Sequence, residues 1–283
     1  MHDVYYSNDQ QRRLGRVLPD IVRARGLMWD LFSKDLRARY RNAVMGFVWA
    51  VLQPLLMMLI LYLVFGVIFA ERIGAADQKH PYAVTLLCGL IFWQYFASCV
   101  SRATTSILDN ADLVKKVYFP REVIPLSALG NCTVNLLIGF IVLLILHLAT
   151  GGGLGFGLLW MAPVLVVQVT LIVGIALLCS SLNVYFRDVG YMVDVGLTFG
   201  FYATPIFYSL DMVRERAANI PGLLSVYMLN PMVGIVTAYR EALLDNRLPN
   251  LAMLGWPALC AIAALALGAA VFRYNSPTIA DHL

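Results

Sequence analysis

Charged residues are scarce in this chain of 283 residues, at 13% of the total against the roughly 25% that is typical of soluble domains. Hydrophobic residues make up 60% of it, and its mean hydropathy is +0.73. A soluble core of this length could not bury so many long uncharged runs, so the composition predicts an all-α polytopic membrane protein. It excludes a transmembrane β-barrel, whose strands give shorter and weaker signals. It also excludes an ordinary nucleic-acid-binding protein, because topology explains the net charge of +4.

The chain also lacks the motifs of catalysis and cofactor binding. It has no G-x-x-x-x-G-K-[ST] loop, so it does not bind ATP by that route. Its four histidines are scattered without metal-ligand spacing, and no Ser or Cys nucleophile motif occurs. Its five cysteines lie inside apolar runs, which favours packing over disulfides. We therefore expect no enzyme, no metal site and no cofactor bound by this chain.

The apolar runs predict six transmembrane helices within a domain of residues 43–273. Each run is long enough to cross a hydrocarbon core of about 30 Å at about 1.5 Å per residue. Between the last two spans, Pro221 and Asn230-Pro231 divide an apolar stretch. Two short re-entrant helices fit this stretch better than a seventh span, but charge alone leaves six against seven open. The predicted spans are 43–70, 81–108, 121–149, 157–185, 189–210 and 248–272.

Basic residues predict the orientation of the chain. Nine Lys and Arg residues lie before the first span and four lie at 102–121, after the second apolar run of 81–101, but only two lie in the loop after the first. The positive-inside rule then places the N-terminus and the second loop in the cytoplasm. With six spans, the tail of residues 274–283 is cytoplasmic as well. No cleavable signal peptide is expected, because the first apolar run is too long for one.

The cytoplasmic segment of residues 1–42 contains a predicted amphipathic interface helix at about 21–40. Arg37, Arg39 and Arg41 stand at its end, directly before the first span. A basic amphipathic helix in that place lies in the membrane interface, with its arginines near anionic lipid headgroups. A solvated basic tail is the alternative, and the role of residues 1–20 stays open.

The cytoplasmic loop at 107–126 is the most informative stretch of the sequence. Asp109 or Asn110 is expected to N-cap a short helix that ends before Pro120. Basic and apolar residues on opposite sides of this helix suit docking to a soluble partner. An ordinary amphipathic connector is the alternative.

Charge inside the uninterrupted apolar runs is almost absent, and Asp194 is the one candidate. Carriers coupled to ions or protons usually place ionisable groups at mid-membrane. Asp194 is expected near the cytoplasmic interface, solvated or paired with Arg187, or else at the entrance of a polar path. The scarcity of coupling charge indicates that the energy for any transport comes from elsewhere.

Aromatic residues gather at the outer ends of the first and fifth spans. They suit core packing and an interfacial belt, or else a conduit whose flat faces stack on sugar rings. Both interpretations stay open, because the sequence does not show which faces point inward. The candidates for lining a channel are Tyr62, Phe65, Phe69, Phe199, Tyr202, Phe207 and Tyr208.

Four segments together resemble the membrane subunit of ABC-2-type polysaccharide exporters, which move lipid-linked O-antigen, capsule or teichoic acid chains. Each segment alone would be only moderately specific. They are LFSKDLRARYRNAVMGFVWAVLQPLLMMLILYLVFGVIF at 31–69, NADLVKKVYFPREVIPL at 110–126, LNVYFRDVGYMVDVGLTFGFYATPIFY at 182–208 and LNPMVGIVTAYREALL at 229–244.

The resemblance implies a homodimer that spans the bacterial inner membrane several times and encloses a channel. Two copies of a separate cytoplasmic ABC ATPase would bind below and use ATP and Mg. Re-entrant helices at about 212–229 and 231–244 would form a periplasmic gate that includes Pro231, Arg240 and Glu241. The residues that would couple the chain to the ATPase are Asp112, Leu113, Lys115, Lys116, Tyr118 and Arg121.

The function that follows from the resemblance is ATP-driven export of a lipid-linked polysaccharide, with O-antigen or capsule favoured. One alternative is an ABC-2-type permease for a lipid or a drug. Another is a membrane-embedded glycosyl or phosphoryl transferase, which would need metal-binding carboxylate pairs that the loops lack. The polysaccharide, its lipid carrier and the type of bacterium are not determined by the sequence.

Overall fold

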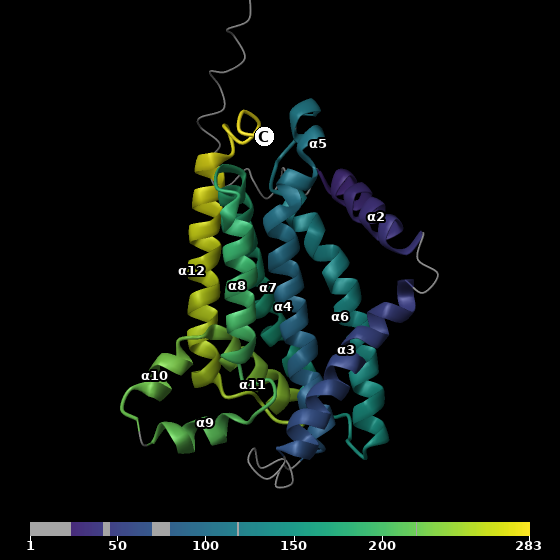
Figure 1. The fold of residues 1–283 in the computed structure, drawn as a ribbon, viewed down its shortest axis with the longest axis vertical. Helices are drawn as coiled ribbons and strands as arrows, with labels where there is room; N and C mark the ends of the chain where they lie inside the picture. The colour runs from purple at the N-terminus through teal and green to yellow at the C-terminus, as the bar shows by residue number, and fades with distance from the viewer. Residues whose placement is uncertain (1–23, 42–45, 70–79, 118, 219) are drawn as a thin grey trace, which may run out of the picture.

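The computed structural model describes residues 24–41, 46–69, 80–117, 119–218 and 220–283. These residues form an all-helical bundle, and no strand occurs among them. The short helix α5 (Ala111–Lys116) and the C-terminus lie at one end of the bundle, here called the α5 end (Figure 1). Three short helices, α9 (Leu210–Ala217), α10 (Leu223–Met228) and α11 (Pro231–Leu243), lie at the opposite end (Figure 1). The domain division predicted above stays a prediction.

Five helical segments are long and apolar enough to cross a membrane. The first is formed by α3, which continues without a break into a π-helical turn, η2. These segments account for five of the six predicted spans. The helices are α3 (Gly46–Leu61) with η2 (Tyr62–Ile68), α4 (Tyr82–Asp109), α6 (Val123–Ala149), α7 (Gly157–Tyr185) and α12 (Leu251–Asn275).

The predicted fifth span corresponds to α8, Asp188–Tyr202, which has only 15 residues. Its length of about 22 Å is less than the hydrocarbon thickness of about 30 Å. The prediction that this helix extends to residue 210 is wrong, because the chain leaves the helix at Ala203. Pro205 explains the stop, since proline lacks a backbone N–H and disfavours helix in the residue before it. The count of six spans therefore stays a prediction.

The apolar stretch before α12 forms three helices. They are α9 (Leu210–Ala217), α10 (Leu223–Met228) and α11 (Pro231–Leu243). The single helix expected at 212–229 is wrong, because Pro221 and Gly222 break it and Gly222 adopts a left-handed φ of 81°. The bounds expected for the helix from Pro231 are confirmed within one residue, and its re-entrant position in the membrane stays a prediction.

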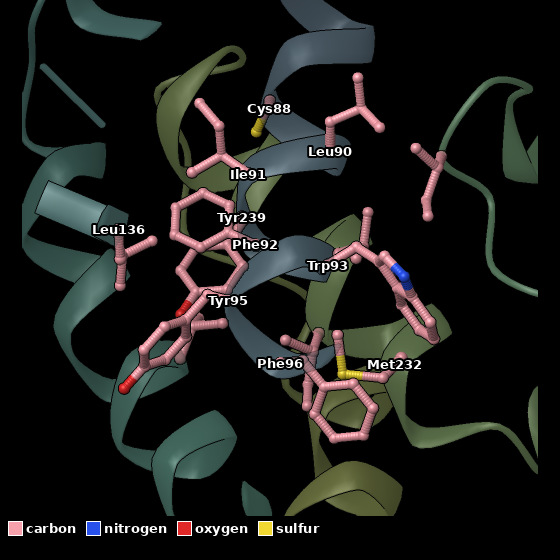
Figure 2. Packing of buried hydrophobic residues seen from close by; sticks show 14 of the residues in the cluster. Cys88, Leu90, Ile91, Phe92, Trp93, Tyr95, Phe96, Leu136, Met232 and Tyr239 are labelled. Atoms are coloured by element: carbon pink, nitrogen blue, oxygen red, sulfur yellow. The ribbon is translucent and has the colours of Figure 1, made fainter. Parts of the chain in front are cut away.

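The centre of the bundle is α4, which is largely buried, whereas the described side chains of α3 and η2 are partly buried or exposed except for Pro54. Figure 2 shows the core around α4, where the ring of Phe92 stacks on the ring of Tyr239 from α11 with centroids 3.5 Å apart. Gln168 of α7 is fully buried and forms hydrogen bonds to both Phe92 and Tyr239. Its amide donates to the Phe92 carbonyl, and its oxygen accepts from the Tyr239 hydroxyl, each at 2.8 Å. This network fixes α11 between two long helices.

A contact between glycines sets the distance between α7 and α12. A Cβ on Gly268 would overlap the backbone of Gly174 on the facing helix. Small residues of this kind allow two membrane helices to approach backbone to backbone.

The predicted interface helix forms α2, Arg25–Arg41. Leu31 is buried, and the ring of Phe32 lies against Gly130 of α6. The described part of the helix thus packs on the bundle near the α5 end (Figure 1).

Candidate functional site

Aromatic side chains from η2 and from the segment after α8 meet at the α9–α11 end of the bundle. Phe65 and Phe207 stack with centroids 4.7 Å apart, and Phe207 contacts the rings of Tyr202 and Tyr208 at 6.2 and 4.9 Å. We call this group the aromatic junction. It joins residues more than 130 positions apart, and Tyr62 belongs to it through the ring of Tyr82. Its members are Tyr62, Phe65, Phe69, Phe201, Tyr202, Phe207 and Tyr208.

The junction contains six of the seven residues that were predicted to line a channel. Tyr202 is 62% exposed, and Tyr62 and Phe69 are also exposed, so their faces are available to a ligand. Phe207, in contrast, is only 9% exposed and packs in the core. The hydroxyl of Tyr82 donates to the Phe207 carbonyl at 2.7 Å and holds this segment against α4.

Phe199, the seventh predicted residue, lies on the outward face of α8. This helix has no buried residue. The side chains on this face, here called the α8 face, recur every three or four positions and are at least 62% exposed. They are Tyr191, Met192, Val195, Phe199 and Tyr202.

Asp194 bonds to a neighbouring helix and not to Arg187. The hydroxyl of Ser101 on α4 donates to a carboxylate oxygen of Asp194 at 3.0 Å. Asp194 is exposed in the single chain, and Ser101 is half-buried. The aspartate therefore marks a polar position on the surface between α4 and α8.

An apolar groove of about 360 Å³ lies beside α8. Its walls come from α4, α7, α8 and the start of α11, and they include Trp93, Phe96, Leu171, Leu197 and Phe199. Gly200 lets α8 approach Trp93, since a Cβ there would lie 2.7 Å from the indole ring. The groove suits a hydrocarbon chain better than a sugar.

Arg240 of α11 ties the α9–α11 end together. Its guanidinium donates to the carbonyls of Ile206 at 2.6 Å, Thr85 at 3.2 Å and Tyr208 at 3.5 Å. It thus satisfies carbonyls of the irregular segment after α8 that no helical N–H reaches.

Asn230 and Pro231 fix the start of α11. The Asn230 side-chain oxygen accepts from the backbone N–H of Met232, and its amide donates to the Ala203 carbonyl and the Thr204 hydroxyl. Pro231 occupies the first turn, where a missing N–H costs no helical bond. The end of α8 and the start of α11 are therefore bonded directly.

Glu241 holds the connection from α11 to α12. Its carboxylate accepts from Arg247 and from the backbone N–H of Asn250, each at 2.8 Å. Together, Pro231, Arg240 and Glu241 all anchor backbone at this end of the bundle.

The α5 end carries the residues predicted to couple to a partner. Lys115, Lys116 and Asp112 are exposed on α5, whereas Leu113 is partly buried among apolar neighbours. Asn110 occupies the N-cap position of α5, but the expected capping hydrogen bond is wrong. Its side-chain amide donates to the Ser106 carbonyl instead. Arg121 is half-buried, and Tyr118 lies outside the described residues.

Among the predicted headgroup residues, only Arg37 has a described side chain, and it is exposed. The side chains of Arg39 and Arg41 lie outside the described part of the structure. Within that part, no group of three His, Cys, Asp or Glu side chains could hold a metal ion.

Sequence reasoning missed three features of the site. The Gln168 network and the Asn230 bonds join residues distant in sequence, so no local pattern signals them. The third is a polar stripe on α4, formed by Gln94, Ser98 and Arg102. Their spacing of four residues places them on one face of a helix, so the sequence could have indicated this stripe.

Known proteins similar to this chain are membrane permeases. The family model of the ABC-2 type transporter matches residues 27–244. The O-antigen export system permease protein RfbA of Myxococcus xanthus is 31% identical over 92% of this chain and 96% of its own length. A protein of the same name from Klebsiella pneumoniae is 32% identical over 78% of this chain and 83% of its own length. The polysialic acid transport protein KpsM of Escherichia coli is 28% identical over 86% of this chain and 91% of its own length.

Proposed function

The chain belongs to the ABC-2 type transporter family, and we propose that it is the transmembrane subunit of an ATP-driven exporter of a lipid-linked polysaccharide, O-antigen or capsule. The similarity to an O-antigen export permease over 92% of the chain carries this assignment. Members of this family are membrane subunits of transporters and not enzymes.

A second copy of the chain completes the channel in this proposal. The α8 face supports it, because large apolar side chains stay exposed along a helix too short to cross the bilayer alone. A partner copy would cover part of this face and leave Phe199 and Tyr202 toward the polymer. Aromatic faces hold sugar rings without fixing one geometry, which suits a chain that slides.

The energy comes from two copies of a cytoplasmic ATPase subunit that uses ATP and Mg. The α5 end faces the cytoplasm in this arrangement, and both termini lie on that side of the inner membrane. The exposed Lys115 and Lys116 support a docking role, because α5 projects beyond the ends of the long helices (Figure 1). Arg37, Arg39 and Arg41 would contact anionic headgroups at this surface.

The α9–α11 end forms the periplasmic gate of the channel. Arg240 and Asn230 support this role, because they bond α11 to the segment after α8. A movement of α8 driven from the α5 end would therefore be passed directly to α11.

Deletion of the gene, followed by analysis of surface glycans, tests the function. We expect surface polysaccharide to disappear while the lipid-linked polymer accumulates inside the cell, and a plasmid copy to restore export. Unchanged surface glycan would overturn the proposal. So would ATP hydrolysis by the purified chain alone, since the proposal places the motor in a different polypeptide.

A further inference from the structure

A small polar cavity of about 90 Å³ lies between α3, α4 and α6. It is separate from the aromatic junction and from the apolar groove beside α8. Most of its polar lining comes from one stripe of α4, with one amide each from α3 and α6. The polar side chains that carry the argument are Gln53, Gln94, Ser98 and Arg102.

This cavity reaches from mid-helix depth to the surface of the chain, where Gln53 and Arg102 are exposed. Gln94 and Asn135 each stand 12 residues after the first residue of their helix, near the middle of α4 and α6. Arg102 stands seven residues before the last residue of α4, which places it about 10 Å inside that helix. Polar and charged groups at such depth are costly and commonly functional.

The cavity holds a positive charge without a counter-charge. None of the residues that line it is Asp or Glu. In the described structure, the side chains of Gln94, Ser98 and Arg102 form no hydrogen bond or ion pair. Two fully bonded amides inside the bundle give the contrast: Asn183 donates to the Thr104 carbonyl and accepts from the Gly190 N–H, and Gln168 uses both ends of its amide.

We propose that this cavity binds the phosphate group of a lipid anchor, an inference that rests on the proposed function and names where the substrate's headgroup is held. Its volume corresponds to about three water molecules, which admits a phosphate group but not a polymer. The guanidinium of Arg102 matches the planar geometry in which arginine binds phosphate oxygens. The amides of Gln53 and Gln94 and the hydroxyl of Ser98 supply further donors.

The position of the cavity gives the anchor a route from the bilayer. α3 forms one wall, and Pro54 is the one buried residue among its described side chains, so a hydrocarbon tail can lie along it. Gln53 on this helix is exposed as well. The lipid tail would stay in the membrane while its phosphate turns inward to Arg102.

Equilibrium binding of radiolabelled dodecyl phosphate to the purified complex of the permease with its ATPase tests this inference. We expect Arg102→Gln to weaken binding roughly tenfold or more, because a charge-assisted hydrogen bond is lost. Ser98→Leu should weaken binding similarly by filling the cavity while the charge stays. Arg102→Lys should retain part of the affinity. The matched control, Arg187→Gln, removes an exposed charge at the start of α8 and should bind like the wild type.

The outcomes separate the possible sources of phosphate. A large excess of inorganic phosphate should compete only weakly, and full competition by it would show a site for free phosphate and overturn the lipid assignment. Wild-type affinity in Ser98→Leu would show that Arg102 meets headgroups outside the cavity. No saturable binding to the wild type would also reject the inference. These results leave the surface-glycan test untouched, so either proposal can fail alone.

Discussion

Gln168 is the residue on which the attachment of α11 depends most directly. Tyr239→Phe removes the hydroxyl that donates to its side-chain oxygen and leaves a buried acceptor unpaired. We expect a loss of about 1–3 kcal/mol in stability, seen as a lower thermal midpoint of the purified protein. The double variant Gln168→Leu with Tyr239→Phe removes both groups.

The double variant should lose less free energy of unfolding than the two single variants lose together. Each single variant leaves one buried group without its hydrogen-bond partner, whereas the double variant removes both groups of the pair. Simple additivity would show that the hydrogen bond does not couple the two side chains. Tyr202→Phe is the control, because that side chain is 62% exposed and its change should leave the midpoint almost unaltered.

At this scale the sequence indicates residue types but not their partners. Arg240 was placed in the gate by resemblance, yet the groups it binds are backbone carbonyls as far as 155 positions away. Every residue has such a carbonyl, so no composition or spacing identifies the acceptors. Arg102 differs, because its place in a stripe of polar residues on an apolar helix is visible in the sequence.

Among the elements, α5 carries the sharpest prediction. Lys115→Glu with Lys116→Glu reverses two exposed charges on a helix of six residues. We expect co-purification of the ATPase to fall at least about tenfold, because like charges across an interface cost several kcal/mol. The matched control is Arg214→Glu with Arg216→Glu on α9, which reverses two exposed charges at the opposite end. Full retention of the ATPase by the α5 variant would contradict docking there.

The elements were predictable where hydrophobic length decides them. Five of the long helices lie close to their predicted bounds, because each apolar run must satisfy its backbone inside the membrane. The errors fall where single residues end a helix. Pro205 stops α8 early, and Gly222 closes a turn that divides the helix expected at 212–229.

Packing between elements was not predictable from the chain. The contact of Gly174 with Gly268 sets how closely α7 and α12 approach, yet other glycines of the sequence lie in open space. Nor does periodicity show that Phe207 is buried and Tyr202 exposed, because both belong to one aromatic run. The aromatic junction forms only when η2 and the segment after α8 meet in three dimensions.

For the whole molecule, the exposed face of α8 predicts how two copies meet. Val195 is 70% exposed in the single chain and lies seven residues from either end of α8. In a background where Cys179 and Cys260 are replaced by alanine, Val195→Cys should give a dimer band with a flexible bis-maleimide in membranes. Ile141→Cys on α6 is the control, because that residue is 57% exposed and we expect lipid there. Three cysteines stay buried and unreactive in both.

The expected difference follows from what an apolar face can contact inside a bilayer. Lipid covers Ile141 at no cost, whereas α8 is too short to span and carries Asp194 at mid-helix beside Ser101. A helix of this kind is stable in the membrane when protein or water covers it. A second copy of the chain would provide protein contacts on one side and enclose a water-filled channel on the other. Cross-linking at position 141 without cross-linking at 195 would place the interface on α6 and detach the α8 face from the proposed channel.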